Sequence, residues 1–164
     1  RRLTAEQLFD ALHQGLGAQA RFEEFPKATK AVQIPGPLNR RKKEAGNDTG
    51  VAFLAQFGQP PRLLACECER TDETTMGQSF SLISGPQVNN LLKRKDNVLG
   101  RLLTEKSDDA AKVESLYWNV LTRAPSAEEK QAMSALLAKS SNKRAMLEDL
   151  AWSLVNAKEF VLRK

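Results

Sequence analysis

Apolar residues recur at helical spacing through the second half of the chain. After residue 74 the apolar side chains return every three or four positions, as they do on one face of an α-helix. No stretch there alternates apolar and polar residues as a half-buried strand would. The pattern therefore predicts amphipathic helices over residues 75–85, 85–95, 96–106, 107–124, 125–139 and 141–164.

Capping residues place the starts of these helices. A Ser or Thr followed three residues later by Glu or Gln satisfies two unpaired N–H groups at once, and proline suits the first position of a helix. The predicted starts are the capping boxes Thr75 with Gln78 and Ser126 with Glu129, the initiating Pro86, and the N-caps Asp96 and Ser107.

One more helix is predicted near the start of the chain, in "LTAEQLFDALHQGLG". Thr4 and Gln7 have the spacing of a capping box. The apolar stripe that follows consists of Leu8, Ala11, Leu12 and Leu16.

The helical pattern is lost over residues 18–50. Pro26, Pro35 and Pro37 interrupt this stretch, and its one apolar alternation is the short "KAVQIPG". We expect an extended segment followed by a mobile surface loop. The next segment, "VAFLAQFG", fits either a short helix or a strand.

These elements predict a mainly α fold. We expect a single compact domain over residues 1–164, with about six to seven amphipathic helices, an irregular and extended middle segment, and a long basic surface loop. Residues 75–164 would form its helical core. The composition, 41% hydrophobic and 27% charged over 164 residues, is typical of one soluble globular domain.

No apolar run approaches the roughly 18 residues that a membrane span requires. The chain begins at Arg1 and not at a methionine, so we expect it to be excised from a longer protein.

Positive charge is concentrated in one short run. The formal net charge is +5, and the four cations Arg40, Arg41, Lys42 and Lys43 with Glu44 contribute a net +3 of it. A nucleic-acid interface would spread cations over a whole face and place aromatic rings among them, so this pattern argues against a nucleic-acid partner. The run is interpreted as a solvated loop, with contact to a polyanion such as an anionic polysaccharide as the alternative.

Both cysteines lie in "LLACECERTDETT". In an extended segment Cys66 and Cys68 would point to the same face about 7 Å apart, too far for an unstrained disulfide. A metal site would need two further ligands. Three interpretations remain open, namely buried packing residues, a redox or disulfide pair, and part of a metal or cofactor site. No cofactor is predicted.

Three other side chains could have a structural or a functional role. His13 lies one position off the apolar stripe of its helix and has no acid or serine at a catalytic spacing, so we expect a partly exposed residue. Trp118 and Trp152 each lie beside an apolar stripe. Either tryptophan fits the edge of the core or the partner-facing side of its helix.

Seven stretches resemble the domain-of-unknown-function family fifteen fifty-three, the C-terminal module of large planctomycete proteins. They occur in the order of the family and cover nearly the whole chain; the pair "FGQPPR" and "CECER" is the specific part. The stretches are "RRLTAEQLFDAL", "KAVQIP", "FLAQFGQPPR", "CECER", "QSFSLISGPQVNNLL", "LYWNVLTRAPSAEE" and "LAWSLVNAKEF".

This resemblance implies a multidomain parent protein that is exported, hence an extracytoplasmic or secreted location. It implies no reaction. Glu69 and Arg70, which carry the resemblance beside the cysteines, fit an internal salt bridge or a charge pair that grips a ligand.

The leading functional hypothesis is a non-catalytic module that packs on or orients a neighbouring domain of its parent protein. Two alternatives remain. One is an enzyme or redox assembly, related to polysaccharides or linked to a cytochrome, with its site at "CECER". The other is polyanion binding through the basic run. Whether the domain is part of an enzyme stays open, with a domain that is not catalytic by itself favoured.

Overall fold

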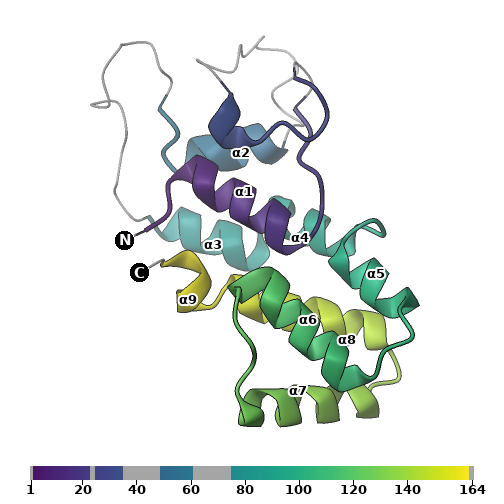
Figure 1. Ribbon diagram of the computed structural model, residues 1–164. Helices are drawn as coiled ribbons and strands as arrows, with labels where there is room; N and C mark the ends of the chain where they lie inside the picture. Colours follow the sequence, from purple (N-terminus) through teal and green to yellow (C-terminus); the bar gives the residue numbers. More distant parts are fainter. Residues whose placement is uncertain (1, 23–24, 35–48, 61–74, 163–164) are drawn as a thin grey trace.

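The computed structural model describes residues 2–22, 25–34, 49–60 and 75–162 (Figure 1). Most of these residues are helical and none forms a strand, so the mainly α fold is confirmed. The elements are α1 (Ala5–Gly15), the 3₁₀ turn η1 (Ala31–Gln33), α2 (Thr49–Gln56), α3 (Met76–Ser84), α4 (Pro86–Lys93), α5 (Val98–Thr104), α6 (Asp109–Leu121), α7 (Ala127–Lys139), α8 (Lys143–Val155) and α9 (Lys158–Val161).

The helices form two groups that share one core. Helices α6, α7 and α8 pack on one another, while α1 packs on α2 and η1, and α3 on α4 (Figure 1). Contacts of α1 with α6, and of α4 and α5 with α8, join the groups. The two ends of the described chain meet, because Arg2 and Leu162 form an antiparallel bridge.

The core is built from the apolar stripes that the sequence predicts. Burial of these side chains is the main favourable term that holds the helices together. Side chains with no more than 2% exposure come from both groups: Leu8, Leu12, Leu16, Leu54, Leu99, Leu102, Leu116, Leu147 and Val155.

The three capping boxes are confirmed, as is Pro86 at the start of α4. Two single caps were wrong by one residue. Asn97 caps α5 in place of Asp96, and Asp108 caps α6 in place of Ser107. Asp96 instead pairs with Arg94, a contact that lowers the pKa of Asp96 to about 2.

Asn97 joins two helices as well as capping one. Its Oδ1 accepts the N–H of Gly100 in α5 at 3.0 Å. Its Nδ2 donates to the carbonyls of Leu91 and Leu92 at the end of α4, at 2.8 and 2.9 Å. The side chain is buried. Asn97 rather than Asp96 is the N-cap of α5, because an amide can donate to those carbonyls and an ionised carboxylate cannot.

The end of the chain differs from the predicted single helix over residues 141–164. Helix α8 ends at Val155, Ala157 is extended, and the short α9 follows. In the middle of the chain, "VAFLAQ" belongs to α2 and the "FG" that follows forms a turn, while the expected extended "KAVQIPG" contains the turn η1. Asp10 of α1 holds this turn, accepting the N–H groups of Ala31 and Val32 at 2.7 and 3.1 Å.

Replacing Asn97 with alanine should lower the free energy of unfolding by about 2–4 kcal/mol, since it removes an N-cap and the donor to the buried carbonyl of Leu91. The carbonyl of Leu92 keeps its bond from Arg144. Chemical denaturation would measure this. Asp96→Ala is the matched control at the neighbouring position, and it should cost far less because that carboxylate is exposed. Equal losses in the two variants would contradict the assignment.

Candidate functional site

Two of the predicted sites lie outside the described residues. For these positions the hypotheses of a chemical site at "CECER" and of a polyanion contact stay predictions. The residues concerned are Cys66, Cys68, Glu69, Arg70, Arg40, Arg41, Lys42 and Lys43.

Trp152 lies beside an exposed apolar face of α3. Its indole N–H donates to the carbonyl of Ile83 at 2.8 Å, and its side chain is 37% exposed. Met76, Phe80 and Ile83 follow one another at i, i+4 and i+7 on α3, and they are 76%, 59% and 48% exposed. We call these three residues the α3 stripe. Trp152 and the α3 stripe place apolar side chains from two helices at the surface together.

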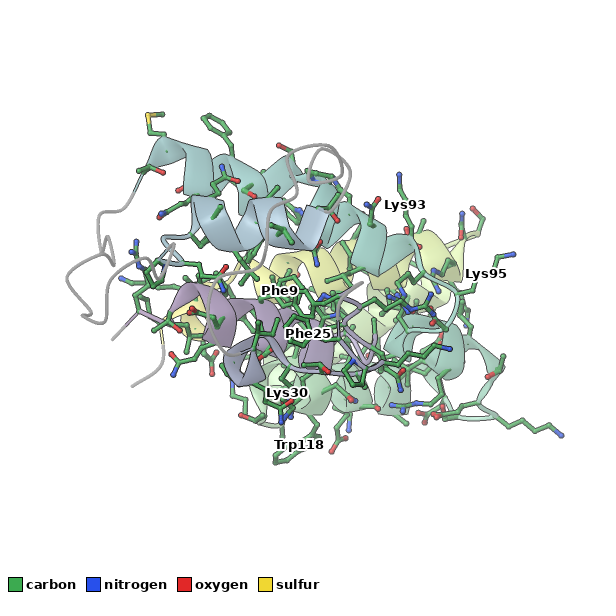
Figure 2. All side chains as sticks on the ribbon, turned by 90° about the horizontal axis from the view of Figure 1, so that it is seen from above. Phe9, Phe25, Lys30, Lys93, Lys95 and Trp118 are labelled. Carbon is green, nitrogen blue, oxygen red and sulfur yellow. The ribbon has the colours of Figure 1, made fainter. Side chains whose placement is uncertain are left out.

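Trp118 is also at the surface, on α6, and is 52% exposed. Figure 2 shows it projecting outward at the edge of the molecule, whereas Phe9 lies inside. Neither tryptophan is therefore a buried core residue.

The expectation of a partly exposed His13 was wrong, because the side chain is buried at 8% exposure. Its Nδ1–H donates to the carbonyl of Ala18 at 3.0 Å. Its Nε2 accepts from the amide of Gln87 in α4 at 2.9 Å, and Gln87 Oε1 accepts the hydroxyl of Thr49 in α2 at 2.9 Å. The carbonyl at Nδ1 fixes the neutral tautomer, with its proton on that nitrogen.

This network joins α1, α4 and α2 and leaves neither ring nitrogen of His13 for a substrate. Burial lowers the pKa of His13 below its usual value, and the bond to Ala18 only partly opposes that shift. A general base needs a ring nitrogen within reach of the proton that it removes. The imidazole therefore acts as a structural joint. Its position beside the stripe did not reveal this, since Gln87 is 74 residues away.

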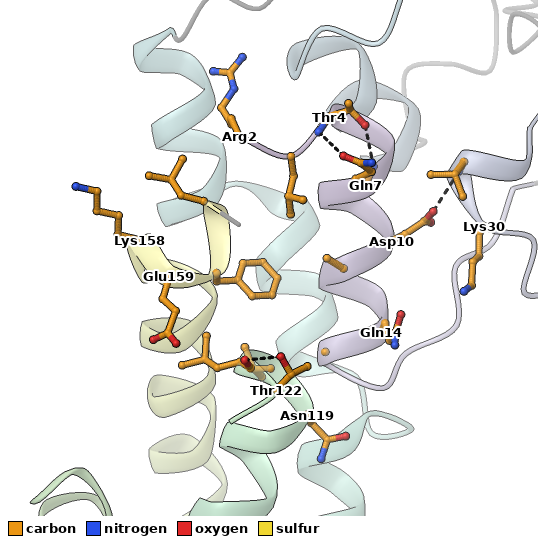
Figure 3. Close-up of a pocket in the computed structure, with 18 residues that line it drawn as sticks. Arg2, Thr4, Gln7, Asp10, Gln14, Lys30, Asn119, Thr122, Lys158 and Glu159 are labelled. Atoms are coloured by element: carbon orange, nitrogen blue, oxygen red, sulfur yellow. Dashed lines mark hydrogen bonds between the residues drawn. The ribbon is translucent and has the colours of Figure 1, made fainter. Parts of the chain in front are cut away.

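A groove of about 1190 Å³ lies between α1 on one side and α9 with the end of α6 on the other (Figure 3). Apolar side chains that include Ala11, Val120 and Phe160 line it, and so do the amides Gln14 and Asn119. Further lining residues are Asp10, Thr122, Glu159, Lys30 and Lys158. The groove was not predicted, because its lining comes from residues more than a hundred positions apart.

Arg123 fixes one wall of this groove. The guanidinium donates two hydrogen bonds to Glu129 in α7, two to Glu159 in α9 and one to the carbonyl of Ala124, which uses all five of its N–H donors. Its bonds, together with the N–H of Ser126, lower the pKa of Glu129 to about 2. "LTRAPSAEE" is thus a helix-joining motif.

The residue before Arg123 has an unusual backbone. Thr122 has φ +57°, in the left-handed region that is costly for a β-branched residue. The other positive-φ residue besides glycine in the described ranges is Ala28, two positions before Lys30 of the groove.

The part of the chain that the structure describes contains neither a metal-binding cluster nor a membrane-spanning helix. No group of three or more His, Cys, Asp or Glu side chains there is arranged to hold a metal ion. No helix in those residues has the length and apolar character to cross a membrane.

The network around His13 predicts a pH dependence of stability. The pKa of His13 is lower in the folded chain than its value of about 6.5 in the unfolded chain, so the unfolded state binds more protons. Stability should therefore be complete above about pH 6.5 and decrease as the pH falls below it, by at most about 1.4 kcal/mol per pH unit.

Urea denaturation between about pH 5 and pH 8 would measure this slope. The chain has one histidine, so His13→Gln provides a clean reference. A variant that keeps the slope of the wild-type chain would show that its origin lies elsewhere.

Comparison with known proteins places the chain in a family. The family model described as "PSD1: Protein of unknown function (DUF1553)" matches residues 1–137, which confirms the resemblance drawn from the sequence motifs. No curated protein and no solved structure matches the chain. Because the matched residues are most of the chain, the protein belongs to the DUF1553 family.

Proposed function

We propose that this chain is a non-catalytic interaction module that docks a neighbouring domain of the same parent protein through the α3 stripe and Trp152. The family resemblance supports a parent that is larger and exported. The module would orient or stabilise its neighbour by burying apolar surface.

The exposure of the α3 stripe is the observation that carries this proposal. A stripe at i, i+4 and i+7 is the pattern of a helix face that packs on another element. Here this face is directed to solvent, while Leu82 on the same helix is buried. Large exposed apolar residues that lie together characterise interaction sites, and tryptophan is enriched among the residues that dominate binding energy.

The polar contacts favour a preformed surface. Trp152 is tied to α3 by its bond to Ile83, so its ring loses little freedom when a partner covers it. Gln78 of α3 also accepts a bond from Arg2 at 3.2 Å. A domain joined to the chain ahead of Arg2 would begin within reach of this helix.

Hydroxyl-radical footprinting would test the docking surface, because methionine and tryptophan side chains react readily. We expect Met76, Phe80 and Trp152 to be less oxidised in the full-length parent protein than in this chain alone, with Trp118 unchanged. Protection of Trp118 in place of Trp152 would move the interface to α6. Concentration-dependent protection in the chain alone would indicate self-association and overturn the proposal.

A double variant gives a second test. Phe80→Ser with Ile83→Ser should change the stability of the isolated chain by no more than about 1 kcal/mol, because both side chains are exposed. In the parent protein it should abolish the protection of Trp152. Leu136→Ser with Leu103→Ser is the matched control, at exposed leucines of α7 and α5. The proposal fails if the control variant has the same effect.

A further inference from the structure

The groove of Figure 3 is open to solvent, and its size suits a stretch of chain. Pockets for small molecules enclose about 300–1,000 Å³, and this groove exceeds that range. Val32 and Leu162, which line it, remain 52% and 39% exposed. An extended ligand could therefore cross it in contact with apolar side chains.

The acids of the groove already have hydrogen-bond partners within the fold. Both oxygens of Asp10 accept backbone N–H groups of η1. Both oxygens of Glu159 accept from Arg123, at 2.8 and 3.1 Å. These carboxylate oxygens are therefore engaged within the fold, and the guanidinium of Arg123 offsets part of the negative charge beside the groove.

Unlike Glu159, the two lysines that line the groove have no charged partner among the described residues. Lys30 and Lys158 lie at opposite rims of the groove, and both are exposed (Figure 3). Neither ammonium group forms an ion pair with any described residue. The groove thus offers two separate positive charges to a ligand that carries carboxylates.

The remaining lining residues favour a peptide. Gln14 makes no side-chain hydrogen bond within the described ranges, and Asn119 uses its Nδ2 on Ser115, so amide groups remain for a peptide backbone. Proteins that bind single-stranded nucleic acids commonly stack the bases on exposed aromatic rings. The one aromatic residue among the lining, Phe160, is only 6% exposed.

From these contacts we infer that the groove binds an acidic peptide segment of a partner chain. Its apolar side chains pack against Val32 and Leu162, and its carboxylates pair with Lys30 and Lys158. The strained backbone at Thr122 lies beside this path, as strain commonly does at binding sites. The inference goes beyond the proposed function, since it concerns a different surface and different residues.

Fluorescence anisotropy with the whole chain would test it. The probe is a short labelled peptide in which glutamate alternates with leucine. We expect saturable binding that becomes about tenfold or more weaker in Lys30→Glu with Lys158→Glu, since two rim ion pairs turn repulsive. Lys106→Glu with Lys139→Glu makes the same change of charge at exposed positions outside the groove and should bind as the wild-type chain does.

Several results would overturn the inference. One is an equal weakening of peptide binding in the groove variant and in the control variant. The others are equal binding of a peptide with lysine in place of glutamate, and the absence of saturable binding. Binding of a sulfated oligosaccharide that depends on Lys30 and Lys158, without binding of the peptide, would assign the groove to a polysaccharide. If the charge-reversed variant does not fold, Lys30→Gln with Lys158→Gln replaces it, and unchanged peptide affinity would then overturn the inference.

Discussion

The unpaired backbone N–H and C=O groups at the ends of short helices must find hydrogen-bond partners elsewhere in the chain. The rest of this structure depends on that constraint. No helix in the described residues exceeds 13 residues, a length at which an isolated helix is marginal in water. Every terminus leaves backbone groups without an intrahelical partner. Here those groups are reached from far away, as when Arg144 of α8 donates to the carbonyls of Leu92 and Arg94 at the end of α4.

The polar side chains that link the helices by hydrogen bonds also set the shape of the functional surfaces. Asp10 holds η1 beside the groove and Arg123 holds α9 there, so the carboxylate oxygens of Asp10 and Glu159 are engaged within the fold. Trp152 holds α3 through a backbone carbonyl and keeps its ring at the surface. Side chains that stabilise the fold therefore also decide what the surface offers to a partner.

Local features were predictable from the sequence, and distant pairings were not. The capping box of Thr75 and Gln78 needs two residues three positions apart, so the sequence alone specifies it. The choice of Asn97 over Asp96 depends on carbonyls that α4 brings alongside, and the burial of His13 depends on Gln87. The periodicity of α3 predicted a helix correctly, but a stripe at helical spacing does not say whether another element covers it.

The bridge between Arg2 and Leu162 has a consequence for architecture. A domain whose two ends lie far apart adds its own length to the protein that contains it. With both ends held side by side, any chain continuing from them would leave from nearly one point (Figure 1). In such a protein the domain would stand out as a lateral branch, and tension along the main chain would load the bridge while the helical core stayed outside the path of the force.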